Sequence, residues 1–343
     1  MENQEQSYEV TSIKVVGIGG AGLNAVNAML AADLTDVEYI AVSTSQARLR
    51  KSHAAVQIRI GSDSRGFGTG GDLEIARAAV LESRQELLNN LQSADLVFLA
   101  AGMGSGTGTG ATPEIAKLVK EAGALVVAVV TKPFAREGKR RMEIAEQGIR
   151  TLLPLVDSLI VIPNDRLIGI SGKGATLLEA FKPADDLLRQ AVQGIVEIVS
   201  KHGHINVDLS DLKTILGSRG MAMMGVGVSN GQDRAAEAAA KAIHNPLLEG
   251  LDIREAKGLL LNIAGSSSMT MDEFDQICRL MTEQISSDAT IIVGVVVDEE
   301  LADQIKVTVI ATGIGNTPDT GKPKLRLAKN RLATIEPKTN HKI

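Results

Sequence analysis

Two glycine-rich clusters are the parts of this 343-residue chain most able to do chemistry. The first is Gly17–Gly22, which reads GIGGAG, and the second is Gly102–Gly110, which reads GMGSGTGTG. Each cluster lies between an apolar strand-like run and a helix-like run. Glycine allows successive backbone N–H groups to turn toward an anion, and the dipole of a following helix adds positive potential. Each cluster is therefore a candidate phosphate-binding loop, and two of them in one chain indicate a nucleotide polyphosphate.

The first cluster taken alone also fits the G-x-G-x-x-G pattern of dinucleotide-binding folds. That pattern needs an acidic residue near the end of the second strand, and residues 43–45, which read STS, hold none. Arg48 and Arg50 could instead accept a 2′-phosphate, so an NADP site stays open. Tight strand–helix packing without any ligand is the other alternative.

The second cluster argues against the dinucleotide interpretation. A nicotinamide-binding fold uses one glycine-rich turn for its pyrophosphate and has no need of a second. No Gly-Lys-Ser/Thr sequence closes either cluster, so the chain has no Walker loop with a lysine clamp. The hydroxyls of Thr107 and Thr109 and the backbone N–H groups remain as phosphate donors.

Apolar runs that alternate with helical patterns must position these two clusters. The sequence predicts strands at 12–18, 37–42, 56–60, 95–101, 124–131 and 157–162. It predicts helices at 24–31, 72–91, 112–122 and 137–153. Nearly continuous apolar strands separated by helices are typical of a parallel sheet covered on both faces. We therefore expect an α/β, doubly wound, Rossmann-like first domain.

A long helix at 177–199 is predicted to separate this domain from a smaller α+β unit. Because proline lacks a backbone donor, Pro183 predicts either a kink or a helix that begins near this residue. The second unit has predicted helices near 208–217, 233–244 and 271–285, and predicted strands near 220–228, 257–264, 290–297 and 305–312.

Composition narrows the class of protein. The net charge of -5 argues against a primary nucleic-acid binder. The single cysteine, Cys278, excludes a disulfide framework and suits a reducing compartment. We find no apolar stretch long enough to span a bilayer and no signal peptide, so we expect a cytoplasmic protein.

The second cluster and several later segments resemble one known family. Gly102–Pro113 is similar to the tubulin-type signature of the FtsZ family of bacterial cell-division GTPases. The resemblance continues through VVTKPFAREGKRR (129–141), IVIPNDRL (160–167), ADDLLRQAVQGI (184–195) and INVDLSDLKTIL (205–216), and it covers about residues 12–315. Chance does not explain a match of this extent.

The resemblance implies a tubulin-like fold and a GTPase that polymerises head to tail in the septal ring at the division site. It implies GTP or GDP as ligand, with Mg²⁺, and the chain itself as partner, together with membrane tethers or division regulators. The implied organisation is a flexible N-terminus (1–11), a GTP-binding domain (12–173), a central helix (174–202), a C-terminal domain (203–315) and a flexible basic tail (316–343). An assembly paralogue with little hydrolysis and a role outside division is the alternative.

The family's nucleotide pocket maps onto residues of this chain by their motifs. Phe181 would stack on the guanine base, and Asp185 would accept hydrogen bonds from it. No dedicated metal ligand is identified. The positions expected to contact GTP are Gly19, Gly20, Ala21, Gly22, Asn24, Gly104, Gly106, Thr107, Gly108, Thr109, Glu137, Arg141, Asn164, Phe181 and Asp185. Without the resemblance, Glu137 and Arg141 would read as a surface ion pair at i,i+4.

The resemblance also implies a catalytic segment far along the chain from both glycine clusters. Asn206, Asp208 and Asp211 would enter the pocket of the next subunit and polarise water near the γ-phosphate. Asp208 could simply cap the following helix, and both roles are compatible. Asp211 is harder to explain as a structural residue.

The chain departs from the family pattern at several places, including Pro183 in the guanine-contacting segment and the loop at 65–72, which keeps the family's glycines but lacks a following proline. The second strand of the family usually ends in Asn-Thr-Asp, whereas residues 43–45 read STS, so hydrolysis is expected to be slower or to depend differently on metal. The family's C-terminal peptide is not recognisable, which suggests a divergent paralogue, a specialised ring protein or a shortened sequence. The basic residues of 316–343 alternate with leucines, so this segment could contact anionic lipid or remain a solvated tail.

Overall fold

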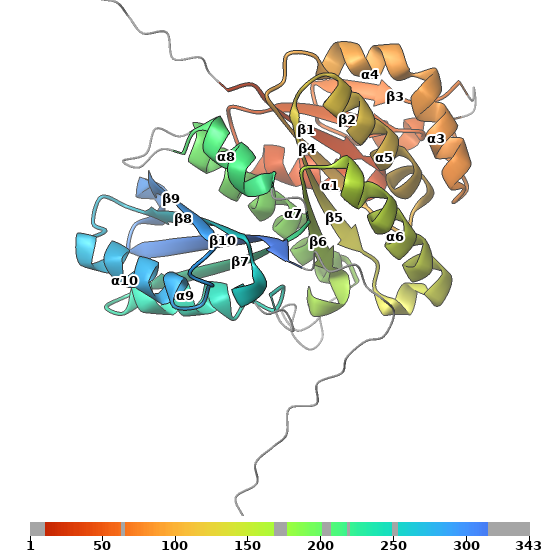
Figure 1. Ribbon diagram of the computed structural model, residues 1–343. Coiled ribbons are helices and arrows are strands. Elements are labelled where there is room, and N and C mark those ends of the chain that lie inside the picture. The colour runs from red at the N-terminus through yellow and green to blue at the C-terminus, as the bar shows by residue number, and fades with distance from the viewer. Residues whose placement is uncertain are drawn as a thin grey trace, which may run out of the picture.

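The computed structural model describes residues 11–62, 66–167, 177–200, 207–217, 220–248 and 253–314. They form one ten-stranded sheet with the strand order β3-β2-β1-β4-β5-β6-β7-β10-β8-β9 (Figure 1). The first half of the sheet is parallel, from β3 to β6. In the second half β10 is antiparallel to both β7 and β8, while β8 and β9 are parallel. A short parallel pairing of β6 with β7 joins the two halves.

The first half has the doubly wound arrangement that the alternation of strands and helices predicts. Its strands are β1 (Ile13–Ile18), β2 (Glu38–Ser43), β3 (Val56–Arg59), β4 (Leu96–Gly102), β5 (Leu125–Lys132) and β6 (Ser158–Pro163). Its helices are α1 (Gly19–Ala31), α2 (Gln46–Leu49), α3 (Leu73–Glu82), α4 (Arg84–Leu91), α5 (Gly106–Glu121) and α6 (Lys139–Leu152). Short 3₁₀ turns follow as η1 (Ala135–Glu137), η2 (Leu153–Leu155) and η3 (Asn164–Leu167).

The second half is the smaller α+β unit. Its helices are α7 (Leu177–Ser200), α8 (Leu209–Leu216), α9 (Arg234–Ile243) and α10 (Met271–Thr282), with 3₁₀ turns η4 (Ile253–Glu255) and η5 (Glu299–Leu301). Its strands are β7 (Met221–Asn230), β8 (Gly258–Gly265), β9 (Thr290–Val297) and β10 (Gln304–Ile314).

Alternate residues of each strand enter cores on opposite faces of the sheet. On one face, side chains of α1 pack on β1 and β4, and side chains of α7 extend this core to β8 and β10. On the other face, α3 to α6 cover the first half, while α9 and α10 cover the second. Helix α7 therefore packs on both halves of the sheet and holds them together.

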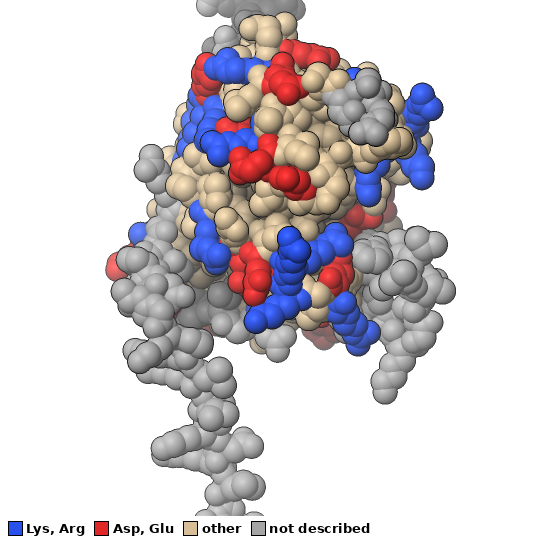
Figure 2. All heavy atoms as spheres, turned by 90° about the vertical axis from the view of Figure 1, so that its right-hand side faces the viewer, with Lys and Arg blue, Asp and Glu red and all other residues tan. Residues whose placement is uncertain are grey.

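Charged side chains of both signs are interleaved on the face shown in Figure 2. Ion pairs also join neighbouring helices of the first half. The Arg84 guanidinium on α4 lies 2.5 Å from the Glu121 carboxylate on α5, and Arg77 on α3 lies 3.0 Å from Glu114 on α5.

Several helix boundaries differ from those predicted. Helix α1 begins at Gly19 and α5 at Gly106, so the later glycines of each cluster form the first turns of the helices rather than parts of separate loops. Ser105 makes this possible for α5, because its hydroxyl accepts a hydrogen bond from the N–H of Gly108 at 3.2 Å. The helix predicted at 72–91 is divided at Ser83 into α3 and α4. Helix α7 begins at Leu177, so a start near Pro183 is wrong.

A buried ion pair between α7 and β10 joins the long helix to the second half of the sheet. Glu197 on α7 is 2% exposed, and its carboxylate lies 3.2 Å from the ammonium group of Lys306. Gln193 and Asn262 donate further hydrogen bonds to the same carboxylate. Because the charge is almost fully removed from water, its partners have to neutralise it.

We expect Lys306→Met to lower the free energy of unfolding by about 3–5 kcal/mol, because it leaves a buried carboxylate unpaired. Urea denaturation followed by circular dichroism would measure this. The control is Lys241→Met, because Lys241 pairs with the exposed Glu237 and its loss should cost less than about 1 kcal/mol. Equal effects of the two substitutions would contradict the prediction.

Candidate functional site

A cavity of about 500 Å³ opens where the parallel strands end at their carboxyl ends. This is the edge at which open α/β sheets bind ligands. The turns after β1, β2, β4 and β5, together with η3 and α7, contribute its walls. The residues expected to contact GTP that line the cavity are Gly20, Ala21, Asn24, Gly106, Thr107, Glu137, Arg141, Asn164 and Asp185.

Other residues of that expected set build the turns rather than the cavity wall. They are Gly19, Gly22, Gly104, Gly108 and Thr109. The Thr109 hydroxyl accepts a hydrogen bond from the N–H of Gly104 at 2.9 Å, so it fixes the turn from within. Gly104 has φ +87°, and a Cβ there would lie 2.8 Å from the carbonyl oxygen of Arg141. No other residue type fits that position without strain.

Two of the residues expected at the site fall outside what the structure describes. Phe181 belongs to α7, but the structure does not describe its side chain. Asn206 lies outside the described residues. Their roles stay predictions.

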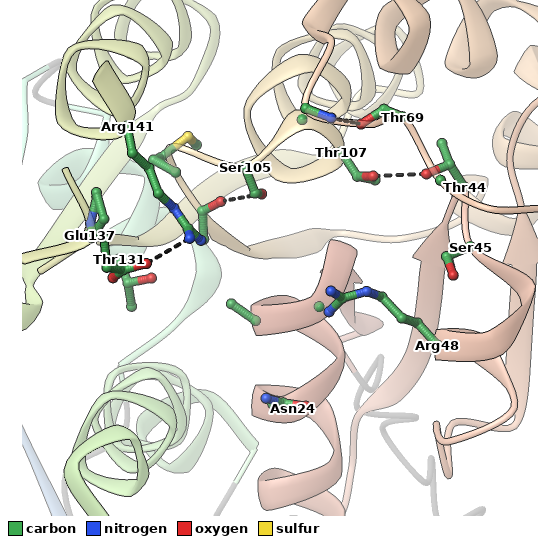
Figure 3. A pocket seen from close by; sticks show the side chains of 18 of the residues that line it. Asn24, Thr44, Ser45, Arg48, Thr69, Ser105, Thr107, Thr131, Glu137 and Arg141 are labelled. Carbon is green, nitrogen blue, oxygen red and sulfur yellow. Dashed lines mark hydrogen bonds and ion pairs between the residues drawn. The ribbon is translucent and has the colours of Figure 1, made fainter. Parts of the chain in front are cut away.

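The cavity is also lined by Thr44 and Thr69, whose hydroxyls are not among the positions expected to contact GTP. Thr44 at the end of β2 and Thr107 in the first turn of α5 share a hydrogen bond of 2.8 Å (Figure 3). Thr69 lines the same wall, and its hydroxyl accepts from the N–H of Gly71 at 3.3 Å. The sequence signal for Thr44 is its place at the end of the second strand, where the family also has a threonine, and the signal for Thr69 is its place between glycines.

Two helix N-termini face the cavity through Gly20, Ala21, Gly106 and Thr107. The first N–H groups of a helix have no partner within the helix, and the dipole makes this end positive. Helix α1 has no side-chain N-cap hydrogen bond and no acidic residue in its first turn. This wall of the cavity is therefore suited to an anion such as a phosphate.

Two polar groups at the α7 side of the cavity, Asn164 and Asp185, are shielded from water. Asn164 is 6% exposed, and its side-chain oxygen has no hydrogen-bond partner among the described residues. Burial raises the pKa of Asp185 on α7 to about 6, because the charged carboxylate is poorly hydrated there. Both groups suit a ligand that carries N–H or O–H donors.

Glu137 and Arg141 form the i,i+4 ion pair and also line the cavity. The guanidinium of Arg141 lies 2.7 Å from the Glu137 carboxylate, across the cavity from Thr44 and Arg48 in Figure 3. The same carboxylate accepts a hydrogen bond from the N–H of Phe134 at 2.8 Å. The pair therefore has a structural role, and its position leaves the Arg141 side chain facing the ligand space.

Asp208 and Asp211 do not line the cavity. They form a reciprocal cap at the start of α8: Asp208 accepts from the N–H of Asp211 at 2.8 Å, and Asp211 accepts from the N–H of Asp208 at 3.4 Å. Asp211 thus has a structural explanation that is not evident from the sequence. Helix α7 carries the chain from Asp185 to Ser200, a distance of about 22 Å at 1.5 Å per residue. The capping box follows that far end.

The donors near the glycine turns suit a metal ion only in part. Thr44, Ser45 and Thr107 offer hydroxyls at this end of the cavity, and no carboxylate accompanies them there among the described residues. Among all the residues that the structure describes, no three His, Cys, Asp or Glu side chains cluster as a metal site. Mg²⁺ commonly binds through substrate phosphates and water, so these hydroxyls fit an ion that a nucleotide brings with it.

The helices that the structure describes include none long and apolar enough to cross a membrane.

Comparison with known proteins accounts for both halves of the chain. Residues 12–172 match the family model of the tubulin/FtsZ GTPase domain, and residues 220–315 match that of the FtsZ C-terminal domain. "Cell division protein FtsZ" of Coxiella burnetii is 46% identical over 313 residues, which are 91% of this chain and 81% of that protein. The protein of the same name from Buchnera aphidicola is 48% identical over 308 residues, which are 90% of this chain and 80% of that protein.

The solved structure "FtsZ dimer, empty (M. jannaschii)" has the same fold, with a TM-score of 0.85 and 37% identity over 95% of each chain. The GTPase model spans both glycine clusters, so the NADP alternative is wrong. The expected fold and resemblance are confirmed. On these grounds the chain belongs to the tubulin/FtsZ family and is a GTPase of the FtsZ type.

Proposed function

We propose that the cavity binds GTP with its phosphates at the N-termini of α1 and α5. The uncapped N–H groups and the hydroxyls of Thr44 and Thr107 supply donors for the phosphates. The base then lies toward α7, where Asp185 accepts from the N1–H and 2-amino groups of guanine. Asn164, whose side-chain oxygen lacks a partner among the described residues, contacts the ribose. The hydroxyls of Thr44 and Thr107 would support a Mg²⁺ ion brought by the nucleotide, which would supply neutralisation of phosphate charge.

We further propose that the chain assembles head to tail and that GTP is hydrolysed between subunits. The observation that carries this proposal is that Asp208 and Asp211 do not line the cavity and follow the end of α7 that is remote from Asp185. We therefore assign these carboxylates to the nucleotide of a neighbouring chain. There they would position and polarise the attacking water. The similar FtsZ of M. jannaschii is a dimer in its solved structure, which supports self-association.

The biological role that fits this assembly is a filament of the cytoplasmic division ring. The two relatives from Coxiella burnetii and Buchnera aphidicola both carry cell division in their names. Membrane tethers and division regulators would be further partners. A weak contact of the basic segment 316–343 with anionic lipid stays a prediction, because that segment lies outside the described residues.

Sedimentation and phosphate release, measured together, test this function. With GTP the protein is expected to pellet and release phosphate, and the rate per molecule should rise with protein concentration because the active site needs two chains. With GDP the pellet should be much smaller. A pellet without phosphate release would favour the non-hydrolysing assembly protein, and a rate per molecule independent of concentration would contradict catalysis between subunits.

A further inference from the structure

One basic residue of the cavity has no place in the proposed mechanism. Arg48 belongs to the short helix α2, is exposed, and lines both the main cavity and an adjoining hollow of about 410 Å³. Figure 3 shows its side chain extending from α2 toward the first turn of α1. A Cβ added to Gly20 would lie 1.9 Å from a terminal nitrogen of this guanidinium. The guanidinium therefore lies directly against the first turn of α1.

No carboxylate of the described residues pairs with this guanidinium. None of the hydrogen bonds and ion pairs between described residues involves the Arg48 side chain, so its N–H donors are available to a ligand. The first turn of α1 contains no acidic residue. Cations are unfavourable at a helix N-terminus, because the dipole there is also positive. Two positive groups in contact, neither paired with a carboxylate of the described residues, indicate that an anion belongs beside both of them in the cavity that they line.

We propose that Arg48 is a phosphate ligand of the bound nucleotide and supplies charge that a carboxylate-held metal ion would otherwise supply. This inference rests on the proposed position of the phosphates at α1. Ser45 offers only a hydroxyl at the end of the second strand, so this side of the cavity lacks an acidic metal ligand among the described residues and carries a guanidinium instead. Guanidinium groups bind phosphate oxygens through charge-assisted hydrogen bonds. Nucleotide binding by this chain should therefore depend little on Mg²⁺.

The consequence can be measured with GDP, which avoids hydrolysis and limits assembly. Isothermal titration calorimetry of the nucleotide-free full chain is carried out once with excess Mg²⁺ and once with EDTA. The wild-type affinity should fall by less than about tenfold in EDTA. Arg48→Ala should lose a further factor of about ten to a hundred in EDTA, the usual contribution of a hydrogen bond to a charged group. With Mg²⁺ the same substitution should matter less, because the ion already neutralises the phosphates.

Arg50→Ala is the matched control, because Arg50 is an exposed arginine of the same segment that does not line the cavity. It should leave GDP affinity unchanged under both conditions, and Arg48→Lys should restore part of the affinity in EDTA. Because the exposed Arg48 side chain makes no hydrogen bond or ion pair with another described residue, Arg48→Ala should keep the wild-type melting temperature. Equal GDP affinities of Arg48→Ala and Arg50→Ala in EDTA would overturn the assignment. If wild type itself failed to bind GDP with Mg²⁺, the proposed nucleotide site would be wrong. That result differs from a failure of the Arg48 assignment alone, in which wild type still binds GDP.

Discussion

Asp211→Asn is expected to reduce GTP hydrolysis by at least about a hundredfold while GTP affinity stays unchanged. Asparagine retains an acceptor for the N–H of Asp208, so the cap of α8 and the fold of this segment should survive. What the substitution removes is the negative charge that we propose to polarise water at a neighbour's γ-phosphate. Phosphate release and calorimetric GTP binding on the same preparation would separate the two effects.

Asp233→Asn is the control for the loss of one exposed carboxylate at a helix start. Asp233 precedes α9 and makes no side-chain capping hydrogen bond. The Asp233→Asn variant should hydrolyse GTP at the wild-type rate. If both substitutions lowered the rate equally, net charge rather than the position of Asp211 would be responsible.

Mixing of variants tests whether two chains share one site. Gly106→Arg cannot keep the pocket, because even a Cβ at Gly106 would lie 2.0 Å from the Thr69 hydroxyl and 3.0 Å from the backbone of Gly71. This variant should bind no GTP but retains its own Asp211. Mixed with Asp211→Asn, it should restore part of the phosphate release, because its carboxylate can serve the GTP bound by the other chain. Absence of any rescue over a range of ratios would argue for a site within one chain.

Asp185→Ala is expected to weaken GTP binding by more than about a hundredfold and to remove most of the discrimination against ATP. A buried site built to pair with hydrogen-bond donors rejects an analogue that leaves its groups unpaired by several orders of magnitude. Adenine presents no N1–H and no 2-amino group to the Asp185 carboxylate. Competition calorimetry with GTP and ATP would measure both affinities.

Asp186→Ala is the control for Asp185→Ala. Asp186 is the adjacent residue of α7, but its carboxylate pairs with Arg189 at 2.6 Å instead of lining the cavity. The Asp186→Ala variant should keep the wild-type preference for GTP over ATP. Equal affinities of wild type for GTP and ATP would refute the role assigned to Asp185.

The raised pKa of Asp185 gives this prediction a pH dependence. Because its pKa of about 6 exceeds the ordinary value of 3.8, the free protein holds the proton more tightly than the unfolded chain. The charged form therefore costs stability above pH 6, and this cost disappears as the pH falls toward 4. Asp185→Asn should raise the melting temperature of the nucleotide-free protein at pH 7.5 and not at pH 4.

Guanine recognition should have the opposite pH trend, since it requires the ionised carboxylate. Wild-type GDP affinity should fall below pH 6 by up to about tenfold per pH unit. Asp185→Asn should bind weakly at every pH and lack this part of the dependence, which separates it from titration of the GDP phosphate. Parallel pH profiles of the two proteins would contradict the assignment.

Much of the fold and the class of ligand could be predicted from the sequence alone. Strands and helices have different spatial periods, so apolar runs such as 124–131 and helical patterns such as 137–153 are recognisable locally. The two glycine clusters indicated the phosphate side, and the resemblance carried by the second cluster and several later segments identified the family. These features depend on neighbours within a few residues or on one continuous motif.

Tertiary structure decided what depends on contacts between distant segments. Arg48 and Gly20, or Thr44 and Thr107, come together only because β2, β1 and β4 lie side by side in the sheet. Helix starts at Gly19 and Gly106 also went against local propensity, since glycine disfavours helices unless capping and packing hold the first turn.

The same is true of the two acidic groups assigned to binding and to hydrolysis. Asp185 and Asp211 are equally acidic in the sequence, and only packing buries the first beside the cavity and leaves the second at the cap beyond the far end of α7. Desolvation and distance are properties of the folded chain, because both depend on which atoms surround a group and not on which residues precede it.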